Sequence, residues 1–492
     1  MAQYKVPGVY VVESGVPLDC IVAVPTAVPI FIGYTERAGS AGRSLTQLPE
    51  RIESMADYEA LFGGPPPLAF TYAETSDVAQ GRYTLEHPHL FVLYASVQLY
   101  FLNGGGPCFV VSVGSYAATP SVDDFAAAFA VLEKAPYGTL VVAPDVASLP
   151  AEVAAAYPAL ALAHCAKVQS RFAILDVPRG DQRPSTGADD PITQFRASVG
   201  ADALNYGAAY YPWLNTTVLA AVDFRAIAPG AMPAFQAALQ RDAQAFFGMA
   251  SQAAQFQALT QTIASLAHDM PDAQAKAADQ LLTASLDVYR TVMADILAGV
   301  NLLPPSGAMA GIYVRVDQSS GVSVAPANVA PSCVASLTVT LSDVDQQDLN
   351  MPLDGKAINA IRMIPACGIV VWGARTLDGN SQDYRYINVR RTLIMLEQSI
   401  QCGLQAYTFS PNNATTWASV NAAISVFLTQ QWQQGALQGA SAADAFSVSV
   451  GLGSTMTGDD VLNGWMRVMV KVSLVHPAEF IVMTFQQQMG ST

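Results

Sequence analysis

The sequence predicts a multidomain α/β protein, and three features of the 492-residue chain predict it. Short apolar segments alternate with helical segments over residues 108–215, which indicates βαβ units and a mainly parallel sheet. Residues 216–299 are rich in Ala and Gln and predict helices alone. From about residue 355, strands and helices follow in another order. We therefore expect a core of mixed β-sheet flanked by helices, formed by the N- and C-terminal segments together, plus an inserted α/β domain that carries a helical insertion.

The expected domain boundaries follow from these changes of pattern. In chain order, the predicted parts are an N-terminal arm joining the core sheet (1–24), a turn-rich part of an outer domain (25–107), the inserted α/β domain (108–215 and 300–354), the helical insertion (216–299), the C-terminal core (355–477) and a C-terminal arm strand (478–492). A chain of this length is expected to hold about two to four domains.

The α/β domain is predicted element by element. Residues 90–107 form an apolar segment that predicts a buried helix ended by glycines. The predicted strands are 108–113, 138–144, 171–178 and 206–214, and the predicted helices between them are 122–135, 151–169 and 191–200. Ser121 is the expected N-cap of the first of these helices.

The remaining elements follow from composition and periodicity. The helical insertion is expected to hold two long helices broken at Pro271. In the C-terminal part, the predicted strands are 368–377, 405–411, 445–451, 464–477 and 478–488, and the predicted helices are 388–403 and 415–435.

Both ends of the chain are predicted strands with apolar side chains on both faces. The residues concerned are Val6, Val9, Tyr10, Val11 and Val12 at the start, and Phe480, Ile481, Val482, Met483 and Phe485 at the end. A strand of this kind must be covered on both faces, and its free edge is normally protected by charge or by a bulge. Two interpretations remain open from these residues: pairing with another chain, or an N–C strand pair within one subunit.

Composition and charge exclude several classes of function. Hydrophobic residues make up 51% of the chain and charged residues 13%, which favours a protein that covers surface against partner subunits. The formal net charge of −15 argues against a basic nucleic-acid-binding surface. No run of 18 apolar residues predicts a membrane span, and no signal peptide is expected.

Catalytic and metal-binding motifs give no candidate. The segment 321–325, GVSVA, only approaches the GxSxG pattern of a nucleophile elbow. His87 and His89 lack a third metal ligand nearby, and the glycines of 103–107 lack the Lys of a phosphate loop. We expect no enzyme, no catalytic or metal-ligating residues and no cofactor, with a subtilisin-like hydrolase as a distant alternative.

Several segments, taken in order, resemble the contractile tail sheath family of phage tails, R-type pyocins and phage-like injection particles. These segments are 6–13, 31–39, 210–214, 303–328, 358–377, 384–400, 432–437 and 476–485. The chain departs from the family pattern in its long 216–299 insertion, in Ala308 where a larger polar residue is usual, and in 449–464. These departures leave open whether it is the main sheath protein or a paralogue at the baseplate or cap end.

The resemblance implies a helical polymer of this chain around an inner tube, assembled extended and able to contract. Its expected partners are further copies, the inner tube protein, and baseplate and tail-cap proteins, with no nucleic acid and no direct membrane insertion. It implies assembly in the bacterial cytoplasm. It also favours pairing of both terminal arms with neighbouring subunits.

One basic cluster is a candidate contact site. The chain is acidic overall, but one span of seven residues holds three arginines: Arg385, Arg390 and Arg391. Arginine at a helix start opposes the helix dipole, so an anionic partner would stabilise it. We expect this cluster to contact the tube or a neighbouring subunit. Pairing within the chain, for example between Arg391 and Asp383, is the alternative.

Overall fold

The structure is a computed structural model that describes residues 21–40, 42–75, 83–86, 91–135, 137–185, 187, 189–247 and 253–480. The chain divides into two compact units. Unit 1 contains residues up to Pro25 and Thr392–His476, and unit 2 contains Thr26–Arg391 and the residues from Pro477 onward. Each unit has its own architecture.

Unit 2 is built on an eight-stranded mixed sheet. In spatial order its strands are β15 (Gly368–Val371), β14 (Ile358–Ile364), β10 (Gly207–Tyr211), β9 (Phe172–Asp176), β8 (Leu140–Val142), β1 (Pro29–Thr35), β7 (Cys108–Ser115) and β4 (Pro49–Ile52). Neighbouring strands run parallel except at the two edges, where β15 and β4 are antiparallel. The predicted mainly parallel sheet is therefore confirmed.

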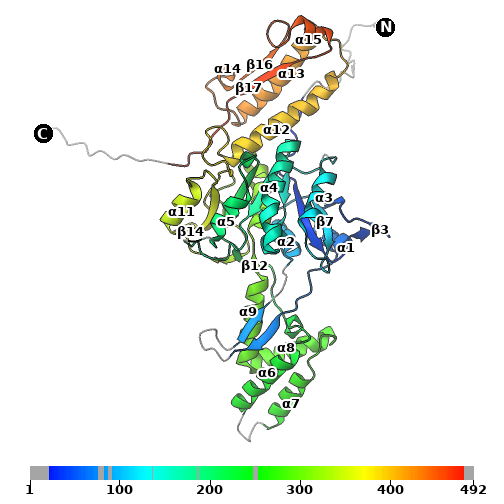
Figure 1. The fold of residues 1–492 in the computed structure, drawn as a ribbon, viewed down its shortest axis with the longest axis vertical. Helices are drawn as coiled ribbons and strands as arrows, with labels where there is room; N and C mark the ends of the chain where they lie inside the picture. Colours follow the sequence, from blue (N-terminus) through cyan, green and yellow to red (C-terminus); the bar gives the residue numbers. More distant parts are fainter. Residues whose placement is uncertain are drawn as a thin grey trace, which may run out of the picture. The chain divides into compact units, whose positions relative to one another are not determined.

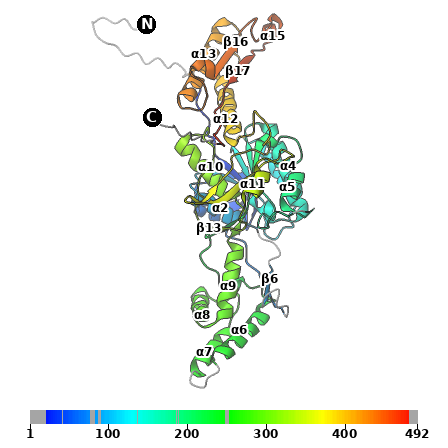
Figure 2. The same ribbon diagram turned by 90° about the vertical axis from the view of Figure 1, so that its left-hand side faces the viewer.

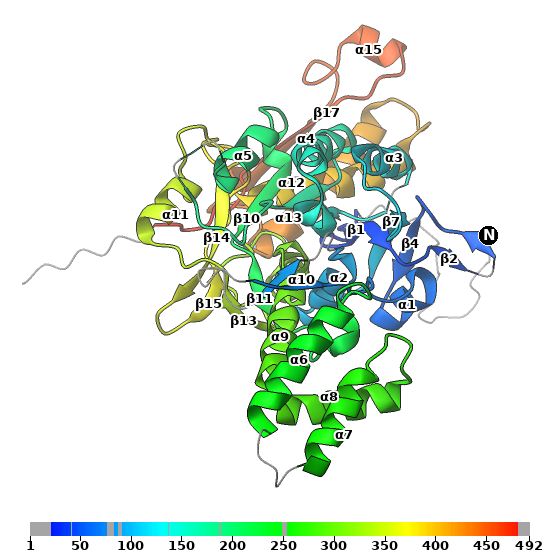
Figure 3. The same ribbon diagram turned by 60° about the horizontal axis from the view of Figure 1, so that its bottom comes forward.

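Helices cover both faces of this sheet (Figure 3). Helices α2 (Leu93–Leu102) and α10 (Ser306–Ser320) pack against each other and share one core with the sheet. Helices α3 (Val122–Leu132) and α4 (Ala151–Val168) lie on the other face, and α5 (Pro191–Ser198) contacts α4. Because both faces are covered, the strands β1, β8 and β10 are buried along their whole length.

Most of the predicted α/β elements are confirmed. Strands β7, β8, β9 and β10 and the helices between them lie within one to three residues of the expected boundaries. Ser121 caps α3, because its side chain accepts a hydrogen bond from the Asp123 backbone N–H in a capping box with Asp124.

The central strand β1 was not predicted as a strand. It lies in the range expected to be turn-rich, and β14 and β15 lie in the range expected to be a separate C-terminal core. All three belong to the sheet that holds the strands of the inserted domain. The sheet therefore crosses the expected boundaries at 107 and 355. As a division into domains, the predicted ranges stay a prediction.

The helical insertion holds four helices in the described residues, not two long ones (Figure 2). They are α6 (Met232–Phe247), α7 (Ala253–Ala264), α8 (Asp272–Ser285) and α9 (Asp287–Val300). The break at Pro271 is confirmed. A second break was missed because fully buried Leu286 adopts extended backbone angles between α8 and α9. The helices pack with β5 (Thr71–Glu74) and β6 (Tyr83–Glu86) around their own apolar core.

In the described residues, unit 1 contains the long helices α12 (Ile387–Leu404) and α13 (Ala414–Gln433), two short helices and a strand pair (Figure 1). Helix α12 begins in unit 2 and continues into unit 1, where α13 packs against strand β16 (Phe446–Val450). Strand β17 (Val468–Val472) pairs with β16. The predicted strand at 405–411 is wrong. It begins with a 3-10 turn at Gln405–Tyr407 and holds Phe409 at a φ of 69°, so its aromatic residues find no partner strand.

The remaining elements are short. They are β2 (Gly39–Ser40), β3 (Arg43–Ser44), α1 (Met55–Phe62), β11 (Leu214–Thr216), β12 (Leu302–Leu303), β13 (Val334–Leu337), α11 (Asp343–Asn350), α14 (Ala442–Ala445) and α15 (Gly458–Leu462). Among the residues that the structure describes, no helix is both long and apolar enough to cross a membrane.

Candidate functional site

The strand pair β16–β17 of unit 1 is the first part of the candidate site. It is antiparallel, with Val448 opposite Val470 and Phe446 opposite Val472. Asn421 of α13 donates to the Val448 carbonyl oxygen at 3.0 Å, which ties the pair to its helix. In the described part of the chain, no further strand pairs with either edge.

Two strands alone make a weak sheet, since an isolated pair is marginally stable in water. Side chains of β17 alternate between half-buried and exposed, and Met469 is 50% exposed. The pair therefore presents a hydrogen-bonding edge and an apolar side chain to whatever adds to it. A sheet edge of this kind is the surface used in binding by strand addition.

The predicted arm residues lie largely outside the described residues. This holds for Val6, Val9, Tyr10, Val11 and Val12 of the N-terminal arm, and for Ile481, Val482, Met483 and Phe485 of the C-terminal arm. Of the predicted arm contacts, the structure describes Phe480, which is 68% exposed. Residues 478–480 adopt no regular secondary structure. The inter-subunit role of both arms stays a prediction.

The predicted basic cluster is not a surface patch. Arg390 and Arg391 are buried, and only Arg385 is partly exposed. The Arg390 guanidinium stacks over the ring of Tyr206 at 4.1 Å, and Arg385 donates from Nε to the Ser381 carbonyl oxygen at 2.8 Å. The expected surface contact through Arg390 and Arg391 is therefore corrected, because both guanidinium groups lie against residues of their own chain.

Arg391 has an acidic partner, but it is Asp317 of α10 and not Asp383. The two side chains form a bidentate pair, with Nη1 to Oδ1 at 3.0 Å and Nη2 to Oδ2 at 2.6 Å. Both are almost fully buried, and Arg391 also stacks over Tyr313 at 4.7 Å. Thr26 donates from its hydroxyl to Asp317 Oδ2 at 2.5 Å, and its carbonyl oxygen accepts from Arg391 at 3.2 Å.

The crevice where an α/β enzyme would bind a ligand is filled by the chain itself. Ligands of such folds bind beyond the carboxyl ends of strands where the strand order reverses, here between β1 and β8. Asp145 occupies this place and accepts from the backbone N–H groups of Tyr34 at 2.8 Å and of Val92 and Leu93 at 2.7 Å. Its carboxylate therefore occupies the N-terminus of α2, where an anionic ligand would bind.

The carboxyl end of the next strand is closed in the same way. Asp176 at the end of β9 accepts from the backbone N–H of Ser306 at 2.8 Å, at the start of α10. Burial raises the pKa of Asp145 to about 7, although the three N–H groups act in the opposite direction. Both carboxylates therefore accept hydrogen bonds from backbone N–H groups at the start of a helix of the same chain.

His164 and His268 each contact groups of the fold itself. His164 lies buried against Arg171, with Nε2 and Nη1 2.8 Å apart, and burial together with that charge lowers the pKa of His164 to about 4. His268 bonds the Ile227 carbonyl oxygen at 2.5 Å. A search of the described residues finds no cluster of three His, Cys, Asp or Glu side chains that could hold a metal ion. His87 and His89 lie outside those residues.

Comparison with known proteins shows which proteins this chain resembles. Residues 380–488 match the phage tail sheath C-terminal domain family. The chain is 28% identical to the anti-feeding prophage (AFP) helical sheath in its contracted state, with a TM-score of 0.63 over 99% of this chain and 100% of that chain. The AFP baseplate structure, 6-fold symmetrised, contains a chain that matches with the same identity, TM-score and coverage.

A third structure extends the likeness. The sheath complex of PVC, an extracellular contractile injection system in its contracted state, is 26% identical, with a TM-score of 0.61 and 99% of each chain covered. No curated protein matches the chain in sequence. The fold and the open strand pair thus define a structural component of phage-tail-like contractile particles. Residues 380–488 belong to the phage tail sheath C-terminal domain family, and the chain as a whole resembles sheath proteins of contractile particles.

Proposed function

We propose that this protein is a sheath subunit that polymerises helically around an inner tube and contracts to drive tube and spike through a target membrane. The observation that carries this proposal is the strand pair β16–β17, which has no further strand on either edge in the described residues. Each terminal arm is predicted from the sequence as a strand with two apolar faces, which would suit insertion between covered surfaces. We propose that arms of neighbouring subunits add to this pair.

The energetics of strand addition suit a polymer that must move without dissociating. A nine-residue arm reaches roughly 30 Å, enough to cross to a neighbour. Four or five ladder hydrogen bonds contribute about 1 kcal/mol each, in addition to side-chain burial. An arm that keeps its ladder while the subunit bodies reorient lets the polymer shorten and widen. New contacts between bodies then supply the free energy of contraction.

The solved relatives support this function. AFP and PVC sheaths are described in contracted states, and both match this chain over nearly its whole length. By this likeness the partners are further copies of the chain, an inner tube protein, and baseplate and tail-cap proteins. The subunit is assembled in the bacterial cytoplasm and acts as a structural protein without catalytic activity. Arg385, the partly exposed member of the basic cluster, keeps the proposed contact to the tube or a neighbour.

A second candidate is a sheath paralogue that sits at the baseplate end. The chain of the AFP baseplate structure resembles this protein as closely as the AFP helical sheath does. A main sheath protein forms long tubes by itself, whereas an end-specific paralogue needs tube or baseplate to assemble.

Negative-stain electron microscopy of the full chain and of a variant lacking residues 1–13 tests both candidates. Hollow tubes from the full chain that are lost in the truncation support the main sheath function and the role of the arm. Tubes from both proteins keep the sheath function and contradict an essential N-terminal arm. Small particles alone from the full chain contradict self-assembly and favour the end-specific paralogue.

A further inference from the structure

The root of the C-terminal arm is held by a bidentate ion pair inside unit 2. Glu479 accepts from Arg375, with Nε to Oε1 at 2.9 Å and Nη2 to Oε2 at 2.6 Å. Asn350 at the end of α11 donates to Oε1 at 2.7 Å, and the Tyr386 hydroxyl donates to Oε2 at 2.9 Å. Three separate segments of unit 2 therefore converge on one carboxylate of the arm.

The arginine of this pair is also held by groups outside the arm. Arg375 is 1% exposed, and its Nη1 donates to the Gly379 carbonyl oxygen at 3.0 Å. Its backbone N–H donates to Asn359 Oδ1 at 2.7 Å. A guanidinium held in this way has lost its freedom already, so little further entropy is lost when it binds Glu479.

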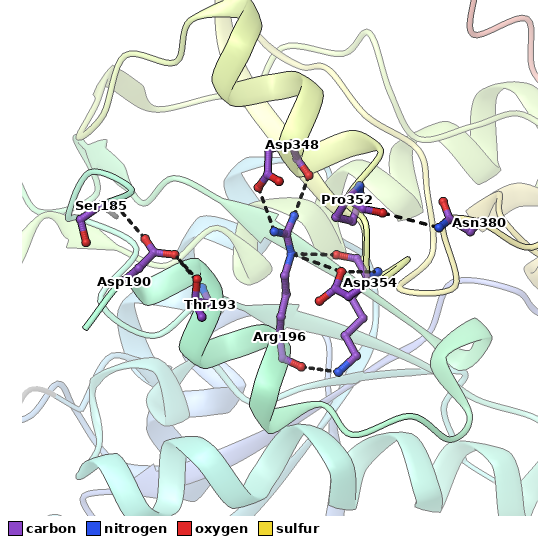
Figure 4. A network of polar contacts seen from close by, with 9 residues as sticks. Ser185, Asp190, Thr193, Arg196, Asp348, Pro352, Asp354 and Asn380 are labelled. Atoms are coloured by element: carbon purple, nitrogen blue, oxygen red, sulfur yellow. Dashed lines mark hydrogen bonds and ion pairs between the residues drawn. The ribbon is translucent and has the colours of Figure 1, made fainter. Parts of the chain in front are cut away.

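The helix that supplies Asn350 is fixed by a second network (Figure 4). Arg196 of α5 donates to the Asp348 side chain at 2.8 Å and to its carbonyl oxygen at 2.7 Å. Lys356 donates in return to the Arg196 carbonyl oxygen at 2.6 Å. This network ties α11 to α5 and to the loop before β14, so Asn350 is presented to Glu479 from a rigid support.

The root of the N-terminal arm also contacts an arginine–carboxylate pair. Thr26 is the first residue of unit 2 after the predicted arm, and its hydroxyl and carbonyl groups both bond the buried Arg391–Asp317 pair. Glu479 is the third residue of unit 2 after unit 1 ends at His476. Each arm root thus meets an arginine–carboxylate pair with a buried arginine within a few residues of the place where the chain enters unit 2, and the Glu479 carboxylate itself is partly exposed.

We propose that Arg375–Glu479 and Arg391–Asp317 are anchoring pairs that hold both arm roots on unit 2, so that pull from neighbouring subunits is passed to the eight-stranded body. This inference rests on the proposed function of the arms. Without an anchor, a neighbour pulling on a ladder of four or five bonds would peel residues 477–480 away from the body, because these residues form no regular secondary structure. Each pair resists this because removal of the carboxylate would leave a buried arginine without its counter-charge.

The test uses Glu479→Gln and Thr26→Val, each of which keeps the shape of the side chain and removes part of one anchor. Glu133→Gln is the matched control, because Glu133 makes an exposed ion pair with Lys167, remote in sequence from both arm roots. Leu282→Ala, a cavity variant in the helical insertion, controls for a general loss of subunit stability.

The first readout is hydrogen exchange in the unassembled subunit. Glu479→Gln is expected to raise exchange of the amides of residues 478–480 at least about tenfold, the change that a loss of ~1.4 kcal/mol produces. Thr26→Val is expected to raise exchange near residue 26, and Glu133→Gln to change neither. Unchanged exchange at both arm roots would overturn the anchoring proposal, whatever the protein assembles into.

The second readout is the urea concentration at which tubes dissociate. Tubes of Glu479→Gln are expected to dissociate at lower urea than tubes of Leu282→Ala, even when the Leu282→Ala subunit is the less stable monomer. Equal dissociation of Glu479→Gln and wild-type tubes would overturn the transmission of pull. Failure of the wild-type chain to form tubes would instead contradict the proposed function, and the exchange experiment would still decide whether the pairs hold the arm roots.

Discussion

The two sheets of this protein differ in how complete they are. The eight-stranded sheet of unit 2 has helices on both faces and fully buried central strands such as β1 and β8. The two-stranded sheet β16–β17 of unit 1 packs on α13, and its strands are half-buried or exposed along their length. All strands of the first sheet, and the helices that cover its two faces, come from one chain. The second has the form of a sheet to which strands from other chains are added.

The difference separates the part of the chain that completes its own fold, unit 2, from the part that we propose for contacts between subunits, unit 1 and the arms. In unit 2, the Asp145 carboxylate fills the crevice between the ends of β1 and β8, where α/β enzymes bind their ligands. In the described residues, the strand pair of unit 1 has no further strand on either edge, and we propose that partners add there. A protein of this construction is expected to keep a stable body in every state of the polymer, and to exchange or retain contacts through unit 1 and the arms.

The largest change in the free energy of unfolding is expected from a substitution at the centre of unit 2. Phe31 of β1 is fully buried and packs edge-on against Tyr100 with ring centroids 5.2 Å apart. Phe31→Ala should lower the free energy of unfolding by about 3–5 kcal/mol, because it removes buried surface and leaves a cavity. Urea denaturation of the unassembled subunit measures this, and a loss below about 1 kcal/mol would contradict the description of unit 2 as a tightly packed body.

The next effect is expected at the filled crevice. Asp145→Asn should destabilise the subunit by about 2–3 kcal/mol, because an amide cannot accept the three backbone N–H bonds that the carboxylate accepts. Thermal unfolding followed by circular dichroism measures the change. Asp123→Asn, at an exposed position in the first turn of α3, is the matched control and should change little. Equal stability of Asp145→Asn and wild type would show that the carboxylate does not stabilise the crevice.

A smaller effect on the subunit is expected in the strand pair. Val448→Ala should cost about 1 kcal/mol or less in the unassembled protein, because Val448 is only half-buried there. In assembled tubes the cost should be larger, since added strands would bury the same side chain. Urea titrations of subunit and tubes give both values. Identical costs in the two states would indicate that nothing covers β16 on assembly.

The smallest effect is a local pH dependence at the C-terminal arm root. Burial alone would raise the pKa of Glu479, but hydrogen bonds from Arg375 and Asn350 and the charge of Arg375 outweigh it and lower the pKa below the usual 4.5. The stabilisation is therefore complete above pH 4.5 and is lost as the pH falls through the lowered value. Amide exchange at residues 478–480, corrected for the intrinsic rate, should rise on acidification in wild type and stay constant in Glu479→Gln. A rise of the same size in both proteins would assign the effect to another group.

The sequence predicted the regular parts of the fold because local pattern decides them. The alternation from β7 to β10 and the capping box at Ser121 depend on residues near one another in the chain. Strand β1 was missed although Ile30, Phe31 and Ile32 form an apolar run, because its pairing partners β7 and β8 lie about 80 to 110 residues away. The segment 405–411 shows the opposite failure, where aromatic and β-branched residues suggest a strand that tertiary structure does not provide.

The candidate site was less predictable than the fold. Its terminal segments are predicted from the sequence as strands with two apolar faces, but the partners that we propose for them belong to other chains, so the sequence of one chain cannot identify the contact. The basic cluster was recognised as three arginines, and its burial was not, because the acid that pairs with Arg391 lies 74 residues earlier, at Asp317 of α10. Glu479 carried no signal of its own, since its partners Arg375, Asn350 and Tyr386 come together only in the fold.

The central claim is that strands from other subunits complete the β16–β17 sheet. A cryo-electron microscopy reconstruction of tubes formed by the full chain, at a resolution that traces the backbone, tests it most directly. The account predicts that β16 and β17 lie in a sheet of more than two strands, with residues 4–12 of one neighbour and residues 478–488 of a neighbour among the additions. A sheet that stays two-stranded in the polymer, with both arms folded onto their own subunit, would contradict it.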